Sequence, residues 1–178
     1  MAAESISSAE MAARQKGLPM ASDQLWRFVL RCYAQPGVEQ ACLRLQAEGA
    51  NVCLLLCGAW LESRQVPVDA DRLHALNECG GRWQSEVVEP LRALRQCWRS
   101  AARTDADLDT LREGVKSLEL TAERVLLERL EILAGPWAAQ PPAAGWLEAL
   151  WPSADPDQLQ SLAIIRAGAH QAQLAGEV

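Results

Sequence analysis

The sequence is poor in the residues that carry most metal and hydrolytic chemistry. Its two histidines, His74 and His170, have no neighbour at the spacing of metal ligands. The Glu-x-x-His pairs of di-iron helical bundles are missing, and a hydrolytic triad would lack a convincing base. Gly80-Gly81 has neither the lysine nor the strand of a phosphate-binding loop. We therefore expect no metal, no cofactor and no catalytic residue, and the sequence favours a protein that is not an enzyme.

Positive charge and long apolar runs are also scarce. The net charge is −6, which opposes attraction to nucleic acid and to anionic lipid. Residues 1–22 lack the basic stretch and apolar core of a secretory signal, and no run is long enough to span a bilayer. These features predict a cytoplasmic protein that binds neither membranes nor nucleic acid.

Residues that favour β-strands are few. Val, Ile and Thr together number 17, whereas Ala and Leu number 56, and unbranched side chains lose little rotamer freedom in a helix. A chain of 178 residues suits one domain with one buried core. We therefore expect an all-α, single-domain helical bundle of about six helices.

The longest uncharged stretch is Val52–Leu61, which has no polar face. Ten helical residues rise only about 15 Å, roughly half of what a bilayer needs. This stretch therefore predicts a central helix packed on all sides by the same domain. Cysteines on apolar helix faces behave as small hydrophobes, so we expect reduced, buried thiols at Cys32, Cys42, Cys53, Cys57, Cys79 and Cys97.

Polar residues that can cap helices mark several expected helix starts. These residues are Ser22, Asn51, Asp69, Thr104 and Asp155. Thr104 and Asp107 have the spacing of a capping box, and Gln158 would complete a second box behind Asp155. Gly80-Gly81 should loosen or break a helix. Pro90 should kink the long helix that contains it without ending it, because the apolar periodicity continues on both sides.

We divide the chain into three parts. Residues 1–21 are expected to form a flexible tail, residues 22–134 the core of the bundle, and residues 135–178 a segment rich in Pro and Trp with a C-terminal helix that packs on the same domain. The tryptophans of the last part either cover the bundle or form a partner-binding patch, and we favour the cover. They are Trp137, Trp146 and Trp151.

An ordered set of motifs between about Leu25 and Leu133 resembles a known family. The motifs are Leu25-Trp26-x-Phe28, Tyr33-x-x-Pro36-Gly37-Val38, Cys42-Leu43-x-Leu45-Gln46, Asn51-Val52-x-Leu54-Leu55-Leu56 with Trp60-Leu61, Trp83 followed by Pro90-Leu91-Arg92-x-Leu94-Arg95, and Glu119-Leu120-x-Ala122-Glu123-Arg124. The family consists of short, uncharacterised gammaproteobacterial proteins, known as conserved hypothetical proteins or a domain of unknown function. The resemblance implies a bacterial, cytosolic helical domain and carries no activity, cofactor or catalytic residue. Its members tend to have an acidic residue at the place of Asn51, and either residue would cap a helix.

Charged residues on two long helices form the candidate binding edge. It comprises Arg92, Arg95, Arg99, Glu119, Glu123 and Arg124. The arginines share one helix edge, which continues to Arg103, and the two glutamates share another at i and i+4. The edge could dock an anion or a partner, with the glutamates orienting Arg92 or Arg95. The alternative is a ladder of salt bridges between the two helices. We favour this alternative, because runs of charged residues are common on helix surfaces.

Trp60, Trp83 and Trp98 lie on or beside the apolar faces of expected helices. They fit either ordinary core positions, which we favour, or the lining of an apolar ligand pocket between helices.

Three functional hypotheses follow from these patterns. The first is a non-enzymatic adaptor or regulator that docks a cytosolic macromolecule, as yet unidentified, through the arginine edge. The second is a small-molecule binder, or an unrecognised enzyme, with a pocket lined by the three tryptophans and a polar mouth at Arg92, Glu119 and Glu123. The third is a structural homodimer.

Overall fold

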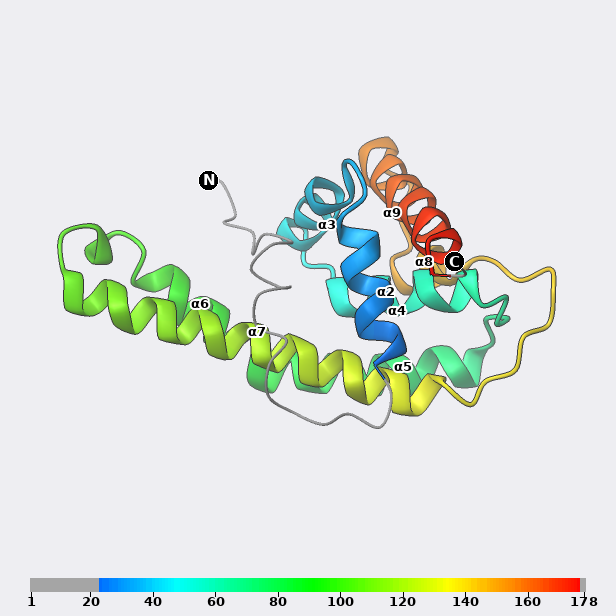
Figure 1. The fold of residues 1–178 in the computed structure, drawn as a ribbon, viewed down its shortest axis with the longest axis horizontal. Helices are drawn as coiled ribbons and strands as arrows, with labels where there is room; N and C mark the ends of the chain where they lie inside the picture. Colours follow the sequence, from blue (N-terminus) through cyan, green and yellow to red (C-terminus); the bar gives the residue numbers. More distant parts are fainter. Residues whose placement is uncertain (1–22, 177–178) are drawn as a thin grey trace.

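The computed structural model describes residues 23–176, and within that range every regular element is a helix (Figure 1). In chain order the elements are α2 (Gln24–Tyr33), α3 (Val38–Ala47), α4 (Val52–Ser63), α5 (Ala70–Trp83), the π-helix η1 (Gln84–Val88), α6 (Glu89–Cys97), the 3₁₀-helix η2 (Ala101–Arg103), α7 (Ala106–Ala134), α8 (Trp146–Leu150) and α9 (Pro156–Leu174). The all-α, single-domain bundle expected from composition is confirmed. The expected N-terminal tail, 1–21, lies outside the described residues, as does the expected cap Ser22.

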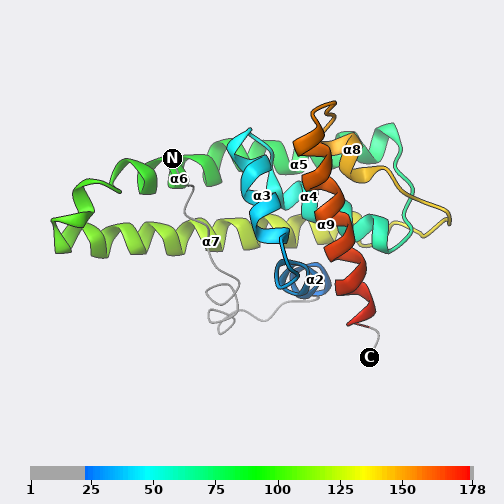
Figure 2. The same cartoon turned by 90° about the horizontal axis from the view of Figure 1, so that it is seen from above.

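The helices form a body and an arm. In both views, α6 and the N-terminal half of α7 run side by side away from the other helices, and we call this projection, residues 89–118, the arm (Figures 1 and 2). Helices α2, α3, α4, α8 and α9 gather at the other end of α7 and form the body. The junction between arm and body therefore lies along the middle of α7.

Helix α4 is the centre of the body, as its sequence predicts. Every residue from Val52 to Glu62 is buried, and α4 contacts α2, α3, α5, α7, α8 and α9. A helix without a polar face can only be stable when neighbours cover all of its sides. The Asn51 side chain caps it by accepting a hydrogen bond from the Leu54 backbone N–H at 3.2 Å.

The other expected helix starts are confirmed in part. Asp69 accepts from the Arg72 N–H at 2.8 Å, and Asp155 accepts from the N–H groups of residues 157 and 158, with Pro156 in the first helical position. The expected cap at Thr104 is wrong, because Asp105 caps α7 instead. The expected capping box at Gln158 is also wrong, because its side-chain oxygen accepts from the Trp151 indole at 2.9 Å.

The helical backbone is continuous from Ala70 to Cys97. It passes through Gly80-Gly81 and through Pro90. Contrary to expectation, α5 passes through Gly80-Gly81 without a break. Gly80 is buried where α5 crosses α4 closely, and an added Cβ would lie 2.6 Å from the Leu54 side chain. The π-helix η1 immediately precedes Pro90. Such wide turns occur where a proline leaves a helical carbonyl without its usual donor, so the proline alters the helix without ending it.

The C-terminal segment covers the body. Trp146 is fully buried, donates its indole N–H to the Val66 carbonyl at 2.7 Å, and stacks on Trp137 with ring centroids 5.9 Å apart. Helix α9 lies against α2, α3 and α4. None of the described helices combines the length and the apolar character that crossing a membrane requires.

Candidate functional site

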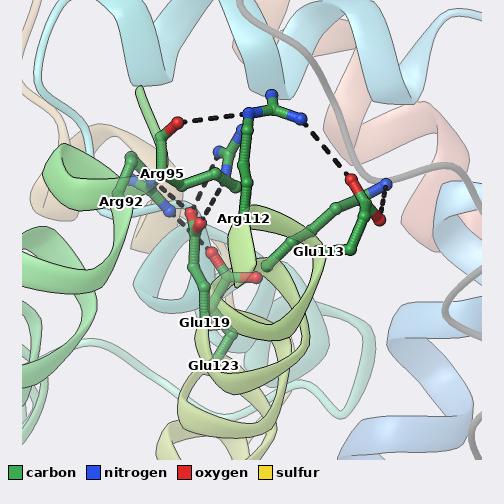
Figure 3. A network of polar contacts seen from close by, with 7 residues as sticks. Arg92, Arg95, Arg112, Glu113, Glu119 and Glu123 are labelled. Atoms are coloured by element: carbon green, nitrogen blue, oxygen red, sulfur yellow. Dashed lines mark hydrogen bonds and ion pairs between the residues drawn. The ribbon is translucent and has the colours of Figure 1, made fainter. Parts of the chain in front are cut away.

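The candidate site is built where α6 faces the middle of α7. The guanidinium of Arg95 donates to both carboxylate oxygens of Glu119, at 2.6 and 3.3 Å. Arg92 donates through Nε to Glu119 at 2.8 Å and through Nη2 to Glu123 at 2.6 Å. Figure 3 shows the four side chains converging from the two helices. We call them the arginine–glutamate cluster: Arg92, Arg95, Glu119 and Glu123.

The cluster is graded from a sealed end to an accessible end. The side chains of Glu119 and Arg95 are only 1% and 7% exposed, whereas those of Arg92 and Glu123 are 15% and 21% exposed. Buried charges are tolerated only when they are paired and hydrogen-bonded, and Glu119 meets this condition with three guanidinium contacts. The sealed end is therefore structural, and Glu123 is the carboxylate that can exchange its contacts.

Two further polar residues support the cluster. Arg112 of α7 is buried and donates through Nε to the Arg95 backbone carbonyl at 3.3 Å, which holds α6 against α7 within the arm. The Gln46 side chain of α3 faces Arg92 from the body. With its amide oxygen turned toward the guanidinium, it accepts from Nη1 and Nη2, each at 2.9 Å. Arg92 therefore lies where the arm meets the body.

A cavity of about 60 Å³ opens beside the accessible end of the cluster. Its polar residues include Arg92, Glu123 and Gln46. The apolar part of its lining comes from four helices, α2, α3, α4 and α7. It consists of Trp26, Val29, Leu43, Val52, Leu56, Leu120 and Leu127, with Tyr33, Cys42 and Cys53 among them. Apolar walls with a few convergent polar groups are typical of small-molecule sites in helical bundles.

One residue of the cavity wall has a buried polar atom without a hydrogen-bond partner. The indole Nε1 of Trp26 is buried, and it is the one buried side-chain nitrogen or oxygen in the described part of the chain without a hydrogen bond. An unsatisfied buried donor costs about 1–3 kcal/mol. Buried N–H groups in native proteins are almost always paired with protein, water or a ligand, so this donor is an exception among the buried polar groups of residues 23–176.

Burial also shifts the protonation of Glu123, one of the two carboxylates that line the cavity. Burial raises the pKa of Glu123 to about 7, against the opposing effect of the Arg92 guanidinium. The two carboxylates keep the pKa of Arg92 above its ordinary value although burial lowers it. Burial also raises the pKa of Tyr33 and of Cys53. Around neutral pH, the group at this site that changes its charge is therefore Glu123.

The other members of the predicted binding edge lie elsewhere. Arg99 is exposed in the turn after α6. Arg124 pairs with Glu128 at 3.1 Å and places its guanidinium 5.3 Å from the centre of the Trp26 ring. The predicted edge is therefore divided: Arg92 and Arg95 face the two glutamates and not the solvent, as in a salt-bridge ladder between helices.

The three tryptophans proposed for an apolar pocket are not on the wall of this cavity. Trp60 is buried in α4 beneath Arg64, whose guanidinium lies 4.4 Å from the ring centre. Trp83 donates its indole N–H to the Ala122 carbonyl at 2.9 Å and lies under Arg129. Trp98 is half-buried at the end of α6. The lining of the cavity includes Arg92, Glu119 and Glu123, the residues predicted for a polar mouth, and its aromatic residues are Trp26 and Tyr33.

Sequence reasoning missed Trp26, Tyr33, Gln46 and Arg112. Arg112 could have been found, because it lies seven residues before Glu119 and therefore on the same face of α7. The first three come from helices α2 and α3, and no sequence periodicity indicates which residues of separate helices meet at a cavity.

Cysteines and acidic residues do not form a second chemical centre in the described range. All six cysteines are free thiols; Cys32, Cys42, Cys53 and Cys57 are buried, whereas Cys97 is exposed, contrary to the expectation for it. Residues 23–176 contain no group of three or more His, Cys, Asp or Glu side chains that could hold a metal ion.

Comparison with known proteins gives one match. The model of a family described as "Protein of unknown function (DUF2390)" matches residues 24–130. No curated protein and no solved structure matches the chain. The matched range contains the whole arginine–glutamate cluster and every residue that lines the cavity.

Proposed function

The chain belongs to the family of proteins of unknown function that its residues 24–130 match, and from this premise we propose that it binds a small organic molecule in the cavity beside Arg92 and Glu123. The observation that carries the proposal is that Trp26, which lines the cavity, has a buried indole N–H without a hydrogen-bond partner. A ligand with a hydrogen-bond acceptor would satisfy this donor and remove its desolvation cost. The protein would then be a binding protein and not an enzyme.

The size of the cavity limits the buried part of the ligand. A single water needs at least about 10–15 Å³ of cavity space, so about 60 Å³ accommodates a group of only a few non-hydrogen atoms. Any larger ligand would have to extend out of the cavity, whose polar lining includes Arg92, Glu123 and Gln46.

The other two functional hypotheses have less support. An adaptor that docks through the arginine edge would need Arg92 and Arg95 to be available, and both donate to glutamates in the same chain. Docking of a macromolecule and homodimer formation both stay predictions. The proposal places the protein in the bacterial cytoplasm, as the resemblance to gammaproteobacterial proteins implies.

The test follows the Trp26 indole by NMR. Each of the seven tryptophans gives an indole cross-peak in a ¹⁵N–¹H spectrum, and Trp26→Phe identifies the one from Trp26. We expect a saturable shift of this peak when acetate, propanoate, butanoate or the corresponding amides are added. Trp83 is the matched control, because its indole N–H already donates to a carbonyl. If no probe moves the Trp26 peak, or both peaks move alike, the proposal is wrong.

A further inference from the structure

The cluster holds two guanidinium groups and two carboxylates that are not equivalent. Glu119 receives three guanidinium contacts and is sealed. Glu123 receives one, from Arg92 to Oε1, and its Oε2 has no hydrogen-bond partner among the described residues. When Glu123 is ionised the cluster is neutral, and when Glu123 takes up a proton the cluster carries one excess positive charge. Protonation of a single side chain therefore turns the cavity into a site for one negative charge.

We infer that the ligand is a short-chain monocarboxylate that binds together with a proton, a step that rests on the proposed function. The ligand carboxylate takes the place of Glu123 at Arg92 Nη2 and accepts from the Trp26 indole N–H. Glu123 is neutralised by a proton from the solvent. The short hydrocarbon chain of the ligand occupies the apolar part of the cavity, next to Val29, Leu56 and Leu120.

The chemistry of the two donors favours a carboxylate. Hydrogen bonds from a guanidinium to a carboxylate are charge-assisted and about twice as strong as neutral ones. A carboxylate has two acceptor oxygens, so it can accept from Arg92 and Trp26 at once. Without proton uptake the ligand would add a third negative charge to a site with two cations, and the repulsion from Glu119 and Glu123 would oppose binding.

The groups around Glu123 are consistent with a single titration near neutral pH. Arg92 and Arg95 face it from α6, Glu119 lies one turn away on α7, Tyr33 approaches from α2 and Cys53 from α4. Burial raises the pKa of both Tyr33 and Cys53, so these groups stay neutral. Burial raises the pKa of Glu123 to about 7. The proton is therefore taken up by Glu123.

The experiment measures butanoate affinity as a function of pH by titrating the Trp26 indole peak. Butanoate stays ionised between pH 6 and pH 8, whereas Glu123 loses its proton over this interval. Linkage then predicts that butanoate binds about tenfold more weakly at pH 8 than at pH 6. Glu123→Gln imitates the protonated side chain, so its butanoate affinity should be the same at both pH values. Glu86→Gln, in an exposed ion pair with Arg82, should keep the pH dependence.

Butanamide separates this inference from the proposed function. The amide has a similar size and an acceptor oxygen but no charge, and we expect it to bind more weakly than butanoate at pH 6 and without pH dependence. If butanamide shifts the Trp26 peak and butanoate does not, or if butanoate affinity is equal at pH 6 and pH 8, the inference is wrong and the binding site stands. If neither probe shifts the peak, both are wrong. The pH series on the unmodified protein decides the matter even if Glu123→Gln fails to fold.

Discussion

Among single residues, Glu119 has a side chain that is only 1% exposed and contacts both Arg92 and Arg95. Replacing Glu119 by Gln removes the negative charge but keeps the size of the side chain, and leaves the buried Arg95 without its counter-ion. Breaking a buried ion pair in this way costs about 3–5 kcal/mol. We therefore expect the free energy of unfolding, measured with urea, to fall by about that amount.

The matched control is Glu86→Gln in η1. Glu86 pairs with Arg82 at 3.0 Å, but both side chains are largely exposed, and exposed pairs contribute about 1 kcal/mol or less. Equal urea midpoints for the two variants would show that the arginine–glutamate cluster does not stabilise the fold.

Glu123 should make stability depend on pH in a direction opposite to that of a typical salt-bridged carboxylate. Its pKa is raised from 4.5 to about 7, mainly by burial, so between these values the folded protein binds more protons than the unfolded chain. The contribution of Glu123 to stability is full below about pH 4.5 and is lost as the pH rises through 7. The loss amounts to about 3 kcal/mol at most.

The measurement is urea unfolding of the wild type and of Glu123→Gln at several pH values. Because other groups titrate in both proteins, the informative quantity is the difference between their free energies of unfolding. As the pH is raised from 5 to 8, the free energy of unfolding of the wild type should fall relative to that of Glu123→Gln. A difference that stays constant would mean that Glu123 has an ordinary pKa in the folded protein.

The cysteines should divide into reactive and protected thiols. Only the thiolate reacts readily with alkylating agents, and burial raises the pKa of both Cys32 and Cys42 to about 12. Cys97 is exposed. With N-ethylmaleimide and mass spectrometry, we expect Cys97 to be modified first in the folded protein, and the buried four only after unfolding in guanidinium chloride. Early modification of Cys53 or Cys57 would show that α4 is not enclosed.

At the scale of elements, two adjacent glycines in α5 should respond oppositely to substitution. An added Cβ at Gly80 would lie 2.6 Å from Leu54 Cδ2 and 2.7 Å from its Cγ, whereas at Gly81 nothing lies within 4 Å. Gly80→Ala must therefore displace the Leu54 side chain or move α5 away from α4, and overpacking of this kind costs about 1–3 kcal/mol. Gly81→Ala should instead stabilise the helix by up to about 1 kcal/mol.

The two variants control for each other, because both replace glycine by alanine in the same helix turn. Thermal unfolding followed by circular dichroism should give a lower midpoint for Gly80→Ala and a higher one for Gly81→Ala. Midpoints that rise in both variants would mean that the approach of α5 to α4 is looser than these distances show.

Elements that depend on local patterns could be predicted from the sequence. The enclosed helix α4 follows from an uncharged run, and the caps at Asn51, Asp69 and Asp155 follow from one side chain beside one helix start. The helix continues past Pro90, as the apolar periodicity on both sides predicted, because η1 leads directly into α6.

The elements that sequence reasoning placed wrongly depend on contacts between helices. Glycine propensity predicts a break at Gly80, but the close contact with Leu54 outweighs it. The cavity wall combines Trp26 of α2 with Leu120 and Leu127 of α7. These residues are about a hundred positions apart in the chain, so their proximity follows only from how the helices pack.

At the scale of the whole molecule, the C-terminal helices complete the core although they lie outside the range that matches the family. Glu62 of α4 is buried and accepts hydrogen bonds from the Gly145 and Leu147 N–H groups at the start of α8. Arg166 of α9 donates to Glu62 at 2.8 and 3.1 Å and also pairs with Glu148. These contacts tie α8 and α9 to the central helix.

A shortened chain tests whether the family-matched range can fold without α8 and α9. Ending the protein at Gln140 removes both helices, exposes the faces of α2, α3 and α4 that α9 covers, and leaves the Glu62 carboxylate without its three partners. We expect the shortened chain to lose cooperative thermal unfolding and to bind hydrophobic dyes. Arg166→Ala in the full chain removes only the guanidinium contacts and should keep a cooperative transition, with stability lowered by about 1–3 kcal/mol. A shortened chain that unfolds cooperatively would show that the part of the chain up to Gln140 folds without α8 and α9, and that these two helices are an addition to a core that is already complete.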